Sequence, residues 1–185
     1  MNIKKRAENH CDAILNIKTE RILDIANMIT KAFKNGNKLL IFGNGGSAAD
    51  AIHLAAEFSG KYLLDRKALP AIALSANVST ITAVANDYSN DMIFERQIES
   101  YAKQGDIVIG ISTSGDSKNV LRAIEKAKEM KALTIGFSGT AGKLKDIVDY
   151  ALIIPSTETP RIQEGYMFAG HIICEIVEEE LYGKK

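Results

Sequence analysis

The sequence lacks several features that mark common classes of protein. It has no net formal charge, because 23 Lys and Arg residues balance 23 Asp and Glu residues. No basic block with interleaved aromatic residues is present, which argues against nucleic acid as the main ligand. No apolar run approaches the roughly 20 residues that a membrane-spanning helix needs. The sequence therefore predicts a protein that acts neither on nucleic acid nor within a membrane.

Cysteine is scarce as well. Cys11 and Cys174 are the two cysteines and lie far apart in the sequence, so no disulfide framework is indicated. Residues 1–8 are basic but lack the apolar stretch of a secretory signal. We therefore expect a reduced, cytoplasmic chain. A length of 185 residues suffices for one domain, residues 1–185, with a sizeable core.

What the sequence does contain is an alternation of short apolar runs and helical patterns. The runs are typical of buried strands and occupy residues 38–42, 70–74, 107–111, 133–137 and 150–154. The helical patterns occupy residues 47–60, 77–86, 91–103, 117–130, 143–147 and 159–181, the last with Thr159 as its expected cap and Pro160 at its start. This order predicts an α/β three-layer sandwich, in which helices cover both faces of a mainly parallel five-stranded sheet.

The first 35 residues carry isoleucine and phenylalanine at near-helical spacing and predict one long helix that ends before Gly36. This segment precedes the first predicted strand. We therefore expect it to pack outside the sheet core, in a bundle between subunits.

Two turns rich in glycine and hydroxyl groups follow predicted strands and open predicted helices. They are Gly43-Asn44-Gly45-Gly46-Ser47 and Ser112-Thr113-Ser114-Gly115-Asp116-Ser117. Free backbone N–H groups at a helix start, with hydroxyls beside them, suit a phosphate or a sugar phosphate. Both turns fall at the carboxyl ends of strands, where the ligands of such sheets bind. Ordinary strand-to-helix turns are also rich in Gly and Ser and form the alternative.

The two turns differ from nucleotide-binding loops. The lysine of a phosphate-transfer loop is absent, so we expect the phosphate to be held rather than transferred. Residues 43–48 fit G-x-G-x-x-A, a loose sequence motif of proteins that bind dinucleotides such as NAD. However, the second predicted strand ends at Ser75-Ala76-Asn77, without the acidic residue that would hold a ribose.

His53 and Glu57 are candidate catalytic residues, because a spacing of four places them on one face of a helix. An exposed ion pair without function is the alternative. The residues expected to pack on the sheet lie on the opposite face of this helix: Ala48, Ala51, Ile52 and Ala55.

The last predicted helix carries His171, which points away from the apolar stripe of that helix. Gln163 lies two helical turns earlier, about 12 Å away along a straight helix. Both side chains reach one small ligand only if Gln163 sits at a frayed helix start. Asn86 and Asp87 follow the second predicted strand and are either a helix-end signal or further ligand contacts.

These residues together resemble the phosphoheptose isomerase family of the sugar isomerase (SIS) domain superfamily. The hydroxyl-rich turn indicates only the superfamily. The His–Glu–Gln–His set, which consists of His53, Glu57, Gln163 and His171, narrows the resemblance to the phosphoheptose isomerases. The resemblance spans nearly the whole chain and rests on residues 43–47, 50–53 with Glu57, 70–73, 86–87, 110–115 and 161–164, followed by His171.

The resemblance implies isomerisation of sedoheptulose 7-phosphate to D-glycero-D-manno-heptose 7-phosphate, for lipopolysaccharide or capsule. It implies a homotetramer with active sites at subunit contacts. Proton transfer at carbon and between oxygens needs a base and an acid, and we assign these roles to Glu57 and His171, with Asp87 positioning hydroxyls. The implied zinc ligands are His53, Glu57, Gln163 and His171. The implied substrate contacts are Asn44, Gly45, Gly46, Ser47, Glu57, Asn86, Asp87, Ser112, Thr113, Ser114, Ser117 and Gln163.

One residue departs from the family pattern, and two alternative functions stay open. Asp116 stands where an asparagine is common, and a carboxylate there disfavours phosphate unless it turns away. The first alternative is another SIS isomerase, acting on arabinose 5-phosphate or an amino sugar, although such enzymes lack the His–Glu–Gln–His set. The second is a non-catalytic protein that associates with a replication initiator and lacks the Glu matched by Glu57.

Overall fold

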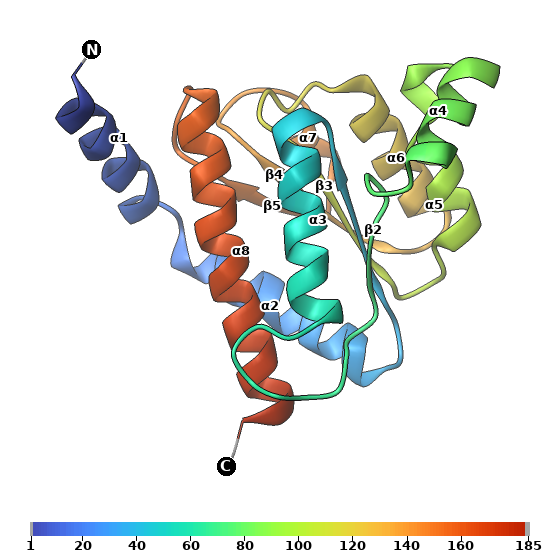
Figure 1. Cartoon of the computed structure of the whole chain (residues 1–185), viewed down its shortest axis with the longest axis horizontal. Coiled ribbons are helices and arrows are strands. Elements are labelled where there is room, and N and C mark those ends of the chain that lie inside the picture. The colour runs from blue at the N-terminus through green and yellow to red at the C-terminus, as the bar shows by residue number, and fades with distance from the viewer. Residues whose placement is uncertain (1, 184–185) are drawn as a thin grey trace.

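A computed structural model describes residues 2–183, which fold around one sheet of five strands (Figure 1). Its order is β2-β1-β3-β4-β5, and every neighbouring pair is parallel. The strands are β1 (Leu39–Gly43), β2 (Ala71–Ala73), β3 (Ile107–Ser112), β4 (Leu133–Ser138) and β5 (Tyr150–Ile153). The predicted parallel five-stranded sheet is thus confirmed.

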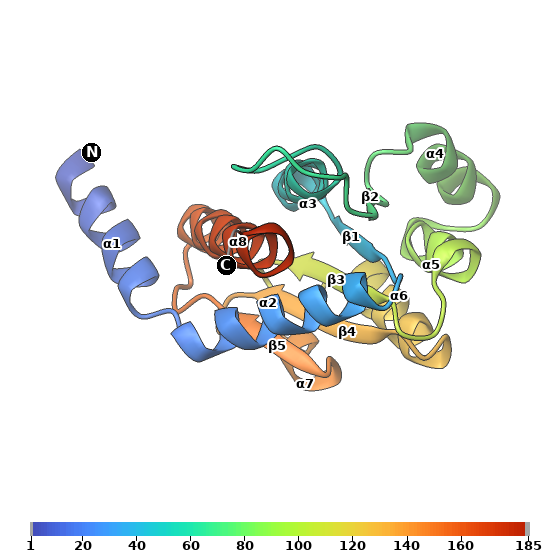
Figure 2. The same cartoon turned by 90° about the horizontal axis from the view of Figure 1, so that it is seen from below.

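Helices cover both faces of the sheet, so the three-layer prediction is confirmed (Figure 2). α2, α3 and α8 share one apolar core with the sheet, while α4 to α7 belong to a second core on the other face. The helices are α1 (Ile3–Leu15), α2 (Thr19–Lys34), α3 (Gly45–Ser59), α4 (Val78–Asp87), α5 (Glu95–Tyr101), α6 (Lys118–Glu129), α7 (Leu144–Ile147) and α8 (Thr159–Tyr182), with a 3₁₀ turn at Asn90–Met92.

The central strands explain why their sequences are continuously apolar. Every residue of β1 and β3 is buried, because each lies between two helical layers. Their register pairs Gly43 with Ile111. The two glycine- and hydroxyl-rich turns therefore leave the same edge of the sheet from neighbouring strands.

The prediction of one long N-terminal helix is wrong. The chain forms two helices, α1 and α2, which are separated at residues 16–18. Leu15 is 82% exposed, whereas Ile17 is 7% exposed and packs in the core. The chain changes direction here because α2 packs on the sheet and α1 extends away from it (Figure 2). Gly36, with φ 77°, follows the end of α2 as expected.

α3 and α8 lie side by side (Figure 1) and run in the same direction, since Gly46 lies against Gln163 and Leu54 against Gly170. The start of α8 differs from the prediction by one residue. Glu158 is the N-cap and Thr159 is already helical, because Pro160 occupies one of the first two helical positions. Among residues 2–183, no helix combines the length and the apolar character needed to cross a membrane.

Candidate active site

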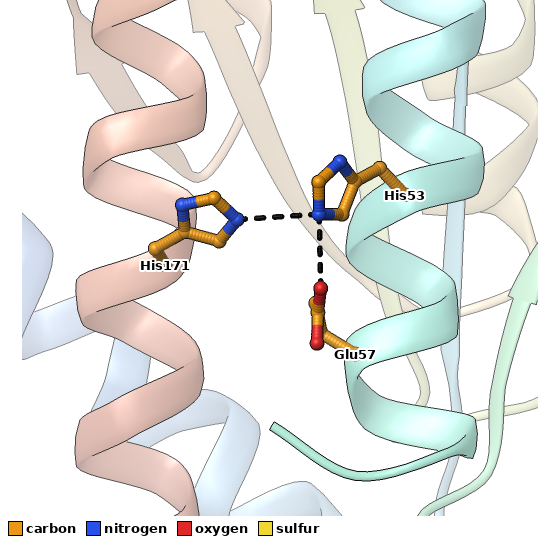
Figure 3. Close-up of side chains that lie close together, drawn as sticks. All are labelled: His53, Glu57 and His171. Atoms are coloured by element: carbon orange, nitrogen blue, oxygen red, sulfur yellow. Dashed lines mark hydrogen bonds and ion pairs between the residues drawn. The ribbon is translucent and has the colours of Figure 1, made fainter. Parts of the chain in front are cut away.

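His53 and Glu57 on α3 face His171 on α8 (Figure 3). The Nε2 atom of His53 lies 2.9 Å from Oε1 of Glu57 and 3.3 Å from Nε2 of His171. The potential ligand atoms of all three residues lie within 4.8 Å of one another. The side chains of His53 and Glu57 are 50% and 22% exposed. The predicted pair is therefore part of a three-residue cluster, open to solvent on one side.

The donor set of this cluster fits a zinc ion. Two imidazoles and one carboxylate form a ligand set that catalytic zinc sites use, with a further position left for water or substrate. Ligand atoms about 2.1 Å from a tetrahedral ion lie roughly 3.4 Å apart, close to the 3.3 Å between the two imidazole Nε2 atoms. Three groups that carry lone pairs thus converge on one point.

The fourth implied ligand lies elsewhere along the two helices. Gln163 is four residues inside α8, in regular helix, so the frayed start considered above is not observed. Its amide nitrogen rests against Gly46, where an added Cβ would lie 2.1 Å from that nitrogen. Only glycine at position 46 leaves room for this amide, which therefore lies beside the first turn of α3.

The side of α3 that packs on the core also differs from the prediction. Ile52 is 42% exposed instead of facing the sheet. The reason is that α8 as well as the sheet covers α3, so its buried face is rotated toward α8, where Leu54 meets Gly170. The buried residues of α3 are Ser47, Ala51, Leu54, Ala55 and Phe58.

The two predicted phosphate-binding turns are connected in the structure. The amides of Asn44 and Asn119 exchange two hydrogen bonds, of 2.8 and 2.9 Å, which link the first turn to the helix that follows the second. Asn119 was not predicted from the sequence, because its only signal there is a place in the first turn of a predicted helix. At the end of β1, Ser75 bonds to both the N–H and the carbonyl of Gly43.

The second turn gathers hydroxyl groups. The Ser112 hydroxyl lies 3.0 Å from that of Ser117 and 3.4 Å from that of Ser114. Thr113 and Ser114 also line a cavity of about 210 Å³, in which Ser156 and Thr159 supply further hydroxyls. The turn thus offers several neutral donors at the end of β3, as a site for an anion requires.

Asp116 turns its carboxylate to the backbone N–H of Lys143, which donates to it at 3.1 Å. This contact meets the condition stated above for a carboxylate in a phosphate-binding turn. Asn86 donates to the Asp87 carboxylate at 2.8 Å, and both are exposed at the end of α4. Within residues 2–183, neither makes a hydrogen bond to the cluster of two histidines and Glu57.

Asp50 lies one turn before His53 on the same face of α3. Burial raises the pKa of its carboxyl to about 6, and the nearby His53 lowers it by a smaller amount. Among the described residues, its Oδ2 atom is buried without a hydrogen-bond partner, as is the Tyr166 hydroxyl. Burial, followed by the Asp50 charge, also raises the pKa of that tyrosine. A partly buried carboxyl with a raised pKa therefore adjoins the cluster.

Tyr62 is a further residue at the site that was not predicted from the sequence. Its ring stacks on His171, with 5.7 Å between ring centroids and 20° between planes. It lies in the loop between α3 and β2, where no periodic pattern marks it.

Comparison with known proteins agrees with this geometry. The SIS domain family model matches residues 4–139. A phosphoheptose isomerase of Clostridium acetobutylicum is 54% identical over 167 residues, which cover 90% of this chain and 85% of the relative. The structure of a phosphoheptose isomerase from Francisella tularensis superposes with a TM-score of 0.92 at 33% identity, covering 96% of each chain. The structure of a phosphoheptose isomerase from Neisseria gonorrhoeae superposes with a TM-score of 0.88 at 34% identity, covering 96% of this chain and 100% of the other chain.

Proposed function

The chain belongs to the SIS domain family, and within it to the phosphoheptose isomerases; from this premise we propose that it converts sedoheptulose 7-phosphate to D-glycero-D-manno-heptose 7-phosphate. One observation carries the proposal most strongly. Glu57 and His171, from helices far apart in the sequence, place ligand atoms within 4.8 Å of each other. A carboxylate beside an imidazole is the pair that proton transfer between neighbouring carbons and oxygens requires.

The reaction needs four proton movements. The Glu57 carboxylate removes a proton from C1 of the ketose while His171 donates one to the oxygen on C2, which gives an enediol. His171 then accepts the proton of the hydroxyl on C1, and Glu57 returns a proton to C2. The carbonyl thereby moves from C2 to C1. Asp87 is assigned to positioning the sugar hydroxyls.

His53, Glu57 and His171 would hold a zinc ion. Gln163, which the resemblance implies as a fourth ligand, lies beside Gly46 in regular helix, so we assign it to substrate binding instead. When bound, the ion would polarise the carbonyl and stabilise the negative charge that develops on its oxygen. A carboxylate that coordinates a cation is a weaker base. An imidazole nitrogen that coordinates a cation can neither give nor accept a proton. We therefore assign proton transfer, rather than metal binding, as the main role of Glu57 and of His171.

The phosphate end of the substrate is assigned to the two turns. Backbone N–H groups at the starts of α3 and α6, together with the hydroxyls of Ser47, Ser112, Ser114 and Ser117, form a neutral anion site. The Asn44–Asn119 amide pair supports this assignment, because it holds the two turns in a fixed relation. The remaining proposed contacts are Gly45, Gly46, Asn86, Thr113 and Gln163.

We further propose a homotetramer, in which α1 contributes to the contacts between subunits. Ile3 and Leu15 on α1 are 73% and 82% exposed, and Ala13 is the one described residue of this helix that is buried. Contact with another subunit would cover these apolar side chains. Light scattering on the full chain should give the mass of a tetramer, and the mass of a monomer would contradict the proposal.

We also propose that the protein is cytoplasmic and that residues 1–185 form a single domain. Its product would supply heptose for lipopolysaccharide or capsule synthesis. The free thiols of Cys11 and Cys174 agree with a reducing compartment. The whole chain would serve as one isomerase unit that supplies heptose phosphate.

Incubation of the purified protein with sedoheptulose 7-phosphate tests the function. We expect NMR to show the signal of the aldose C1 and exchange of the C2 proton with solvent. Ribulose 5-phosphate, the ketose related to arabinose 5-phosphate, serves as the competing substrate and should react far more slowly. Faster turnover of this pentose would favour the other SIS isomerase, and turnover of neither would favour a binding protein.

A further inference from the structure

The imidazole of His171 lies between two aromatic rings. The Tyr62 ring stacks on it, with 20° between planes, and the His53 ring meets it at 60°, with 5.1 Å between centroids. A flat ring held between a stacked and a tilted neighbour has little freedom to rotate. The stacked neighbour thus restricts the direction in which Nε2 of His171 points.

Glu178 holds Tyr62 in place through the backbone. It lies two helical turns after His171, on the same side of α8. Its carboxylate accepts hydrogen bonds from the N–H groups of Tyr62, Leu63 and Leu64 at 3.1, 2.7 and 2.7 Å. The loop that carries Tyr62 is thereby fixed to the helix that carries His171.

Arg66 connects the same carboxylate to the end of α3. Its Nε donates to Glu178 at 2.7 Å, and the side chains of the pair are only 1% and 2% exposed. Its Nη2 donates to the carbonyl of Glu57 at 2.8 Å, and its Nη1 to that of Phe58 at 2.9 Å. The last carbonyls of a helix lack partners within the helix. A buried ion pair thus joins the helix of Glu57 to the helix of His171.

We propose that Tyr62 is a positioning residue, which orients the His171 imidazole toward His53 and Glu57 and is itself held by the Arg66–Glu178 pair. The role belongs to the aromatic ring, since the contact with His171 is ring on ring. This inference rests on the proposed function where activity is concerned. The orientation of the His171 ring, however, is measurable without substrate.

The test compares Tyr62→Leu with Tyr62→Phe. Histidine ring protons are observed by NMR in protein without added metal, and His171→Gln identifies one of the three histidines. Nuclear Overhauser effects between the ring protons of His171 and His53, whose ring centroids lie 5.1 Å apart, should be lost in Tyr62→Leu, and Tyr62→Phe should restore them. With sedoheptulose 7-phosphate, kcat should fall roughly tenfold in Tyr62→Leu, the scale expected for one aromatic pair. KM should stay within about twofold, and Tyr62→Phe should recover kcat.

Tyr101→Leu is the matched control, because Tyr101 is partly exposed on α5 and lies outside the site. Equal thermal unfolding of the three variants shows that each is folded. Unchanged Overhauser effects between His171 and His53 in Tyr62→Leu would overturn the proposal, as would their loss with unaltered kcat. A wild-type protein that does not isomerise the heptose refutes the proposed function, while the NMR comparison still decides whether Tyr62 orients His171.

Discussion

The Nε2 atoms of His53 and His171 lie 3.3 Å apart, although 118 residues separate the two histidines in the sequence. The contact exists because α3 and α8 pack side by side in the same direction, with Gly170 against Leu54. A Cβ at Gly170 would lie 2.5 Å from the nearest Leu54 carbon. The approach of two helices, rather than any local motif, therefore creates the site.

Removal of the His53 imidazole should weaken metal binding. His53→Ala deletes the atom that contacts both other members of the cluster. We expect more than a tenfold loss of zinc affinity, since even changes behind the direct ligands cost this much. Competition with a chromogenic chelator measures it. His10→Ala is the control, because His10 contacts Glu164 instead, and equal zinc binding by the His53 variant would contradict its role as a ligand.

A methyl group at position 46 should displace the Gln163 amide. Gly46→Ala places a Cβ within 2.1 Å of the amide nitrogen, so the side chain must move. A misplacement on this scale can lower kcat/KM by about 100-fold. The free energy of unfolding should change little, because the displaced group is the end of a flexible side chain. In a Gln163→Ala background the added methyl should have almost no effect; a Gly46→Ala enzyme with full activity would refute the contact as functional.

The hydroxyls of the second turn should contribute to binding more than to turnover. Substitution of both Ser112 and Ser114 by Ala removes two neutral donors, each worth about 1 kcal/mol. We therefore expect KM to rise between roughly 10- and 30-fold, with kcat lowered less. Ser100→Ala, on the exposed face of α5, is the matched control. A fall in kcat with unchanged KM would assign the turn to chemistry instead of phosphate binding.

The Glu178 carboxylate should stabilise the protein in a pH-dependent way. Burial raises its pKa, but hydrogen bonds from the backbone N–H groups of Leu64, Leu63 and Tyr62, and from Arg66, outweigh burial and hold that pKa below 4.5. A depressed carboxyl pKa stabilises the fold above the unfolded value of 4.5, and this contribution is lost as pH falls through the folded pKa.

Urea unfolding of Glu178→Gln checks this account. At pH 7 the variant should lose about 3 kcal/mol of unfolding free energy, because Arg66 is left buried without its partner. The difference from wild type should shrink at pH 4 and below. Glu175→Gln, on the exposed side of α8, should be nearly neutral throughout. If the difference in unfolding free energy between wild type and Glu178→Gln stays constant from pH 7 to pH 3, the carboxylate charge is not the source of the stabilisation.

The sequence predicted the sheet well because its signal is local. β1 and β3 are continuous apolar runs between glycine-rich turns, and both lie fully buried. The break between α1 and α2 was missed, because Ile14 and Ile17 continue the helical spacing and neither glycine nor proline marks residues 16–18. The break follows from tertiary packing, which buries Ile17 and leaves Leu15 exposed.

The site was predicted only where spacing or family resemblance revealed it. A spacing of four was enough to pair His53 with Glu57. Helical phase singled out His171, and the resemblance joined it to that pair. Tyr62 and Glu178 were missed for a physical reason. Glu178 is bonded mainly to backbone N–H groups, which any residue type supplies, so its partners leave no pattern in the sequence.

The turnover of Glu57→Gln with sedoheptulose 7-phosphate tests the central claim most directly. The amide keeps the size of the side chain but cannot accept a proton from carbon. We expect kcat to fall by about 100- to 10,000-fold, while the substrate dissociation constant, measured by calorimetry, changes only a few-fold. An enzyme that turns over at the wild-type rate without this carboxylate would contradict the account.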